Sequence, residues 1–165
     1  MLCITGTQRS GTTAAASLFK AEGYDLGSDL WDEVGGLENE TICAFYRDYL
    51  GDPVFPFSNF PNLPEGHANH FALLDLPVVK FSMLCMNPAF VTIWSKFRPP
   101  EKGDRFLIMK RGIRAVTESK DAHREIFSQD SWLLNQDSGT MRANRAMSIR
   151  YLQDLGYPIS VMHFE

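Results

Sequence analysis

The segment that most constrains the fold is the first one, residues 1–19, which reads MLCITGTQRSGTTAAASLF. Residues 2–5 are apolar or β-branched, as in a short buried strand, and the small and apolar residues from Thr12 onward are typical of a packed helix start. Gly6 and Gly11 permit a tight loop between the two. Backbone N–H groups left unpaired at the first turn of a helix, together with the helix dipole, favour an anion. The segment therefore predicts a strand, a loop and a helix that together bind phosphate or a similar anion.

Strand-like and helix-like segments alternate along the rest of the chain. Further strands are expected at 76–81, 105–110 and 159–164, with a very short edge strand at 24–27. Helices are expected at 10–21, 38–50, 87–97, 113–127 and 138–154. This alternation indicates an α/β fold of three αβα layers around a mainly parallel sheet. Because ligands bind beyond the carboxyl ends of parallel strands, residues 6–13, Lys80 and Arg111 should meet at one edge of that sheet.

Length and charge limit the class of protein. With 165 residues the chain can build one sizeable core, so we expect a single domain, residues 1–165. A net charge of −4 argues against a general nucleic-acid binder, and an anion site would need local cations. No apolar run approaches the roughly 20 residues that span a bilayer, and a strand that starts at residue 2 leaves no room for a signal peptide. We therefore expect a soluble, cytoplasmic protein with no membrane or nucleic-acid partner.

The cysteines argue against a metal or disulfide framework. Cys3, Cys43 and Cys85 are odd in number and include no Cys-x-x-Cys pair. We expect all of them to be buried as small apolar side chains. Neither a zinc site nor a stapled scaffold is predicted.

The first loop differs from a nucleoside triphosphate site in one position. Gly6 and Gly11 have the Gly-x4-Gly spacing of a nucleotide P-loop, but Thr12 stands where the P-loop lysine belongs. Without that lysine, charge on a phosphate must be balanced by another cation, and Arg9 inside the loop is the nearest one. An ATP or GTP site is therefore disfavoured.

Residues 9–13, Arg-Ser-Gly-Thr-Thr after an N-terminal strand, resemble the phosphosulfate-binding loop of sulfotransferases. A second element of that family is an arginine at the end of a later strand, followed by a serine eight residues further on, and Arg111 and Ser119 match it. Weaker similarity at 36–45 and 161–165 extends the resemblance over most of the chain. The resemblance implies a P-loop-like fold and transfer of a sulfuryl group from 3′-phosphoadenosine-5′-phosphosulfate to a hydroxyl or amine, without a metal. The acceptor would be an unidentified small molecule or carbohydrate.

The resemblance also implies a set of site residues. Those expected to bind the donor are Thr7, Gln8, Arg9, Ser10, Gly11, Thr12, Thr13, Arg111 and Ser119. Arg9 and Lys80 would be catalytic, because they would stabilise the leaving 5′-phosphate and the transferring sulfuryl group. The position of the family's catalytic histidine holds Ser82, so the base is unassigned. Candidates to replace it are Glu38, Glu40, His67 and His70.

Two alternatives remain open. The segment from Cys3 to Ser10 fits the Cys-x5-Arg-Ser signature of low-molecular-weight tyrosine phosphatases, in which a thiolate attacks phosphate. That chemistry requires Cys3 at the start of the loop with a lowered pKa. The other alternative is a catalytically degenerate P-loop domain that binds a nucleotide or a protein partner without turnover. Ser82 at the histidine position and the short segment after the last strand favour it.

Overall fold

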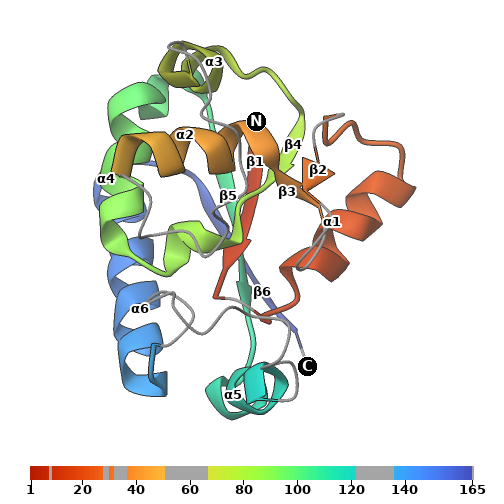
Figure 1. Ribbon diagram of the computed structural model, residues 1–165, viewed down its shortest axis with the longest axis vertical. Coiled ribbons are helices and arrows are strands. Elements are labelled where there is room, and N and C mark those ends of the chain that lie inside the picture. The colour runs from red at the N-terminus through yellow and green to blue at the C-terminus, as the bar shows by residue number, and fades with distance from the viewer. Residues whose placement is uncertain (8, 28–29, 32–36, 51–66, 122–135, 165) are drawn as a thin grey trace.

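The computed structural model describes residues 1–7, 9–27, 30–31, 37–50, 67–121 and 136–164 (Figure 1). A parallel sheet with the strand order β4-β1-β5-β6 forms the centre. Its strands are β1 (Leu2–Gly6), β4 (Val78–Lys80), β5 (Arg105–Lys110) and β6 (Ile159–His163). Two very short strands, β2 (Leu30–Trp31) and β3 (Glu38–Asn39), pair antiparallel beside it.

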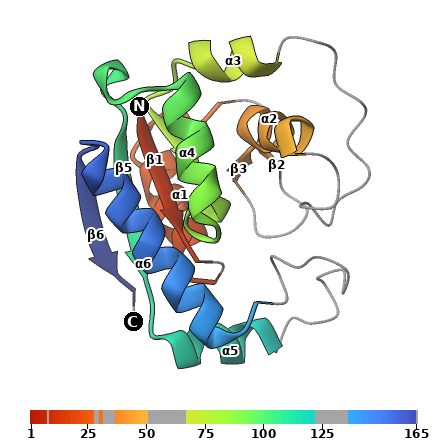
Figure 2. The same ribbon diagram turned by 90° about the vertical axis from the view of Figure 1, so that its left-hand side faces the viewer.

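Helices cover both faces of the sheet. The helices are α1 (Thr12–Ala21), α2 (Glu40–Leu50), α3 (His67–Leu73), α4 (Pro88–Phe97), α5 (Ile113–Asp121) and α6 (Ser138–Asp154), with short 3₁₀ turns at Ser82–Cys85 and Pro100–Lys102. Figures 1 and 2 show α1 on one side of the sheet and α4 and α6 on the other. This arrangement confirms the expected α/β fold with a parallel sheet between helical layers.

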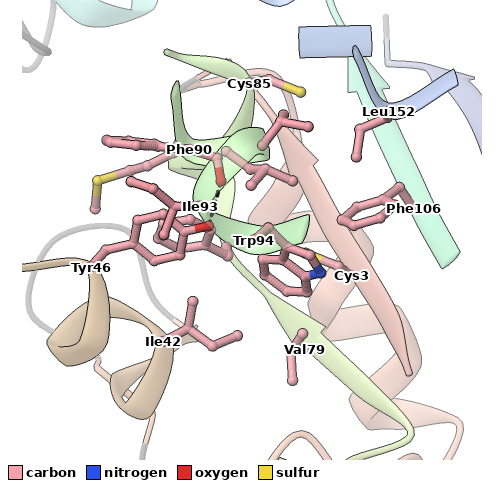
Figure 3. Close-up of a cluster of buried hydrophobic side chains, with 14 of the residues drawn as sticks. Cys3, Ile42, Tyr46, Val79, Cys85, Phe90, Ile93, Trp94, Phe106 and Leu152 are labelled. Atoms are coloured by element: carbon pink, nitrogen blue, oxygen red, sulfur yellow. Dashed lines mark hydrogen bonds between the residues drawn. The ribbon is translucent and has the colours of Figure 1, made fainter. Parts of the chain in front are cut away.

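Neighbouring residues of β1 and β5 enter two different cores, as period-two alternation requires. Ile4 and Leu107 pack with α1 in the smaller core. Cys3 and Phe106 face the larger core on the opposite side, which is centred on Trp94 of α4 (Figure 3). Strands β1 and β5 are buried on both faces and are largely apolar, whereas β6 at the edge of the sheet is mostly exposed.

The connections between the strands change direction between β1 and β5. From β1 the chain passes to its neighbour β4, whereas from β5 it passes to β6 on the opposite side. Gly6 at the end of β1 pairs with Met109 near the end of β5. Ligands of such sheets bind where connections diverge in this way, so the ends of β1 and β5 mark the expected site.

Most helices and strands predicted from the sequence are present in the structure, but some predicted bounds are wrong. The strand at 105–110 and the helix at 138–154 have the bounds that the sequence predicts. The edge strand expected at 24–27 is wrong, because those residues form no strand. The helix expected from 38 begins at Glu40 instead, because the two residues before it pair with β2. The end of the helix expected at 113–127 lies outside the described residues beyond Asp121.

Within the parts of the chain listed above, no helix is both long enough and apolar enough to cross a membrane.

Candidate functional site

The β1–α1 loop has a tightly constrained backbone. Arg9 and Gly11 both adopt left-handed φ angles, 63° and 94°, and the N–H of Ser10 donates to the carbonyl oxygen of Thr7 at 3.2 Å. A Cβ on Gly6 would lie 2.5 Å from Ser10 Oγ and 2.6 Å from the carbonyl oxygen of Met109. Only glycine fits there. The loop is therefore held closely against the ends of β1 and β5.

Two hydroxyl groups in this loop are buried and have no acceptor. Thr7 Oγ1 and Ser10 Oγ are shielded from solvent and make no hydrogen bond within the described part of the chain. An unsatisfied buried polar group costs about 1–3 kcal/mol, so such groups point to a missing ligand. Helix α1 begins at Thr12, and its N-cap residue, Gly11, has no side chain to cap it. The amino end of this helix, where backbone N–H groups favour an anion, therefore lies beside the two hydroxyls.

Arg111 lies against the same loop. Its Nη1 donates to the carbonyl oxygen of Arg9 at 3.3 Å, across 102 residues of sequence. Its guanidinium carbon lies 5.7 Å from the centre of the Phe164 ring, and its buried Nε has no hydrogen-bond partner among the described residues. The edge rule for parallel sheets thus predicts correctly that Arg111 lies beside the loop.

Lys80 links the first turn of α1 to a buried acid. It ends β4 and is only 2% exposed. Its Nζ donates to Thr13 Oγ1 at 2.9 Å and forms an ion pair with Glu38 Oε1 at 3.0 Å. A positive charge is therefore fixed between the first turn of α1 and a carboxylate.

Glu38, one of the four residues that the sequence offered in place of the family histidine, is buried next to Lys80 and Ser82. It is 6% exposed, and its carboxylate accepts from the Ser82 N–H at 3.1 Å and from the Ser82 hydroxyl as well as from Lys80. The sequence offered it only as one of several replacements for the family histidine. What the sequence could not show is that Ser82, at the histidine position, would hold this glutamate in place.

The other candidate bases lie elsewhere or are not described. His70 lines a pocket of about 680 Å³ together with Asp25, Asp75 and Leu76. Leu76 precedes β4, so this pocket opens toward the amino edge of the sheet, away from the loop. Glu40 and His67 lie in α2 and α3, and their side chains are outside the described part.

Of the remaining residues predicted to bind the sulfuryl donor, the structure describes some only in part. Thr12 is the first residue of α1 and is buried. Ser119 lies in α5, two turns from its start, but its side chain is not described. Gln8 lies outside the described residues. Nothing in the structure therefore places Gln8 or the Ser119 hydroxyl at the site.

Cys3 does not have the environment of a nucleophile. It lies within β1 and is fully buried in the larger core near Trp94 and Phe106 (Figure 3). Burial, and then the charge of Asp104, raise the pKa of the Cys3 thiol well above its usual value. A thiol that is protonated and cut off from the loop does not fit the phosphatase mechanism.

Neither protein-family models nor curated protein sequences give a match to this chain. Over the described residues, no group of three or more His, Cys, Asp or Glu side chains is arranged to hold a metal ion.

Proposed function

We propose that this protein is a sulfotransferase that takes a sulfuryl group from 3′-phosphoadenosine-5′-phosphosulfate. The observation that carries the proposal is the position of Lys80, which connects Thr13 of the anion loop to the buried carboxylate of Glu38. A cation between an anion site and a base is what transfer of a charged group to a hydroxyl or amine requires. The Arg-Ser-Gly-Thr-Thr sequence and the Arg111 to Ser119 spacing supply the family resemblance.

The chain's own residues divide the work between binding and transfer. The hydroxyls of Thr7 and Ser10, with the amides at the start of α1, would bind the 5′-phosphate end of the donor. Arg9 would offset the charge that develops on the leaving phosphate, and Arg111 would bind the second phosphate. When bound, the donor supplies the sulfuryl group, so the protein contributes alignment and charge stabilisation more than covalent chemistry.

Glu38 is the base in this proposal. Its carboxylate is held in one orientation by both Ser82 donors, and Lys80 faces both it and the loop. Moving the ammonium of Lys80 toward the transferring group would free a lone pair of Glu38 Oε1, which the Ser82 hydroxyl still holds in place, to accept the acceptor's proton. The thiols of Cys3 and Cys85 are free and buried, which fits the expected cytoplasmic location.

Calorimetric binding of 3′-phosphoadenosine 5′-phosphate tests the donor site. The wild type should bind this product more tightly than ATP, and Arg9→Asn should weaken binding at least about tenfold through the loss of a charge-assisted contact. Asparagine tolerates the left-handed backbone of position 9, so the loop should survive the change. Arg114→Gln, which removes an arginine that is almost fully exposed on α5, is the matched control and should bind normally.

Transfer itself is tested by release of the product nucleotide in the presence of a panel of hydroxyl and amine acceptors. Glu38→Gln should bind donor with unchanged affinity and lose transfer. Binding in the wild type with no transfer to any acceptor would favour the non-catalytic nucleotide binder. No binding at all, or tighter binding of ATP, would contradict the sulfotransferase proposal.

A further inference from the structure

We infer that Phe164, at the end of β6, is a positioning residue that fixes Arg111 against the anion loop. The inference rests on the proposed donor site and adds a residue to it from the last segment of the chain. The inference is based on three contacts of Phe164, which involve Lys110, Arg111 and Gly11.

The first contact fixes the backbone of Phe164 next to Arg111. The N–H of Phe164 donates to the carbonyl oxygen of Lys110 at 2.7 Å, immediately before Arg111 in the sequence. This bond continues the β5–β6 pairing, in which Lys110 lies opposite His163. The aromatic side chain therefore emerges beside the arginine at the carboxyl edge of the sheet.

The second contact is between the ring and the guanidinium group. The Arg111 guanidinium carbon lies 5.7 Å from the ring centre of Phe164, within the range of a cation–π interaction. The ring is 37% exposed, so water screens the contact only in part.

The third contact is between the ring and the loop. A Cβ on Gly11 would lie 2.5 Å from Phe164 Cγ and 3.0 Å from its Cβ. Gly11 is thus needed both for its left-handed backbone and because the ring lies directly on it. One side chain therefore touches the loop and the arginine at the same time.

Together these contacts restrict the movement of Arg111. Its Nη1 donates to the carbonyl oxygen of Arg9, and its guanidinium carbon lies over the ring of Phe164. The buried Nε has no hydrogen-bond partner in the described residues. An arginine held in this way has already lost most of its side-chain freedom, so an anion that meets Nε binds without ordering it.

The test uses Phe164→Leu, which keeps an apolar side chain against Gly11 and removes the aromatic face. In calorimetry it should bind 3′-phosphoadenosine 5′-phosphate about fivefold more weakly, the size expected for a partly exposed cation–π contact. Phe164→Tyr should restore wild-type affinity. Met162→Ala is the matched control, because Met162 lies on the same strand, is 48% exposed and should bind within about twofold of the wild type.

A second measurement does not depend on the donor. In the protein without ligand, the side-chain Nε–H signal of Arg111, assigned with Arg111→Lys, should shift in Phe164→Leu because the ring no longer lies over the guanidinium. A purely structural role would lower the melting temperature without this shift. If Phe164→Leu leaves both the signal and the affinity unchanged while the wild type binds, the positioning role is wrong and the donor site stands. If the wild type binds no nucleotide, the donor site fails, and the Arg111 signal in Phe164→Leu then decides the positioning role by itself: a shift supports it and an unchanged signal overturns it.

Discussion

Replacing Lys80 with methionine removes one half of a buried ion pair and leaves the other half in place. Lys80 and Glu38 lie 3.0 Å apart and are almost completely shielded from water. Among the described residues, the donors that the carboxylate then keeps are the N–H and the hydroxyl of Ser82. Breaking a buried pair in this way costs about 3–5 kcal/mol of unfolding free energy. That is a large part of the roughly 5–15 kcal/mol that stabilises a typical domain.

Urea unfolding followed by circular dichroism at pH 7 measures this cost. The double variant Lys80→Met with Glu38→Gln should recover at least half of the loss, because no unpaired charge then remains buried. The matched control is Arg150→Met, which breaks a pair with Asp154 whose arginine is 79% exposed and should change stability by less than about 0.5 kcal/mol. A loss below about 1 kcal/mol in Lys80→Met would refute the claim that the pair is desolvated.

Two further predictions concern the loop and the buried thiols. Gly6→Ala should abolish nucleotide binding and destabilise the fold, because the new Cβ would collide with the backbone of β5. Gly112→Ala is the control: its Cβ would meet no atom within 4 Å, so nucleotide binding measured by calorimetry should be unchanged. Burial raises the pKa of the Cys85 thiol from 9.0 to about 12. Above about pH 9 the thiol therefore loses its proton in the unfolded chain but keeps it in the folded one, and the free energy of unfolding falls by up to about 1.4 kcal/mol per pH unit. Cys85→Ala should make the fall in urea midpoint between pH 8 and 10 shallower, and an unchanged slope would disprove this cause.

Local signals explain why some elements could be predicted from the sequence. Helix α6 follows Asp137, whose carboxylate accepts from the N–H groups of Gly139 and Thr140 at 2.7 and 2.9 Å, and Gly156 with φ of 87° follows its end. Helix α4 has Asn87 as its N-cap and Pro88 as its first residue. Each of these boundaries is set by residues within one turn of it, and a sequence shows such residues directly.

The position of Glu38 beside Lys80 and Ser82 could not be predicted in the same way. It depends on a two-residue strand, which is too short to produce a pattern of alternation. It also depends on contact with Ser82, 44 residues away, and with Lys80 on a different strand. The edge rule predicted that Lys80 and Arg111 would lie near the loop, because strand ends follow from topology. Which acidic side chain lies next to Lys80 depends on how distant segments of the chain pack together, and no local sequence pattern shows this.

A crystal structure of the protein with bound 3′-phosphoadenosine 5′-phosphate tests the central claim most directly. The proposed donor site predicts the 5′-phosphate at the start of α1, within hydrogen-bond distance of Thr7 Oγ1 and Ser10 Oγ. It predicts the 3′-phosphate beside Arg111. A nucleotide bound at the opposite edge of the sheet, or a loop that holds no ligand at saturating concentration, would contradict it.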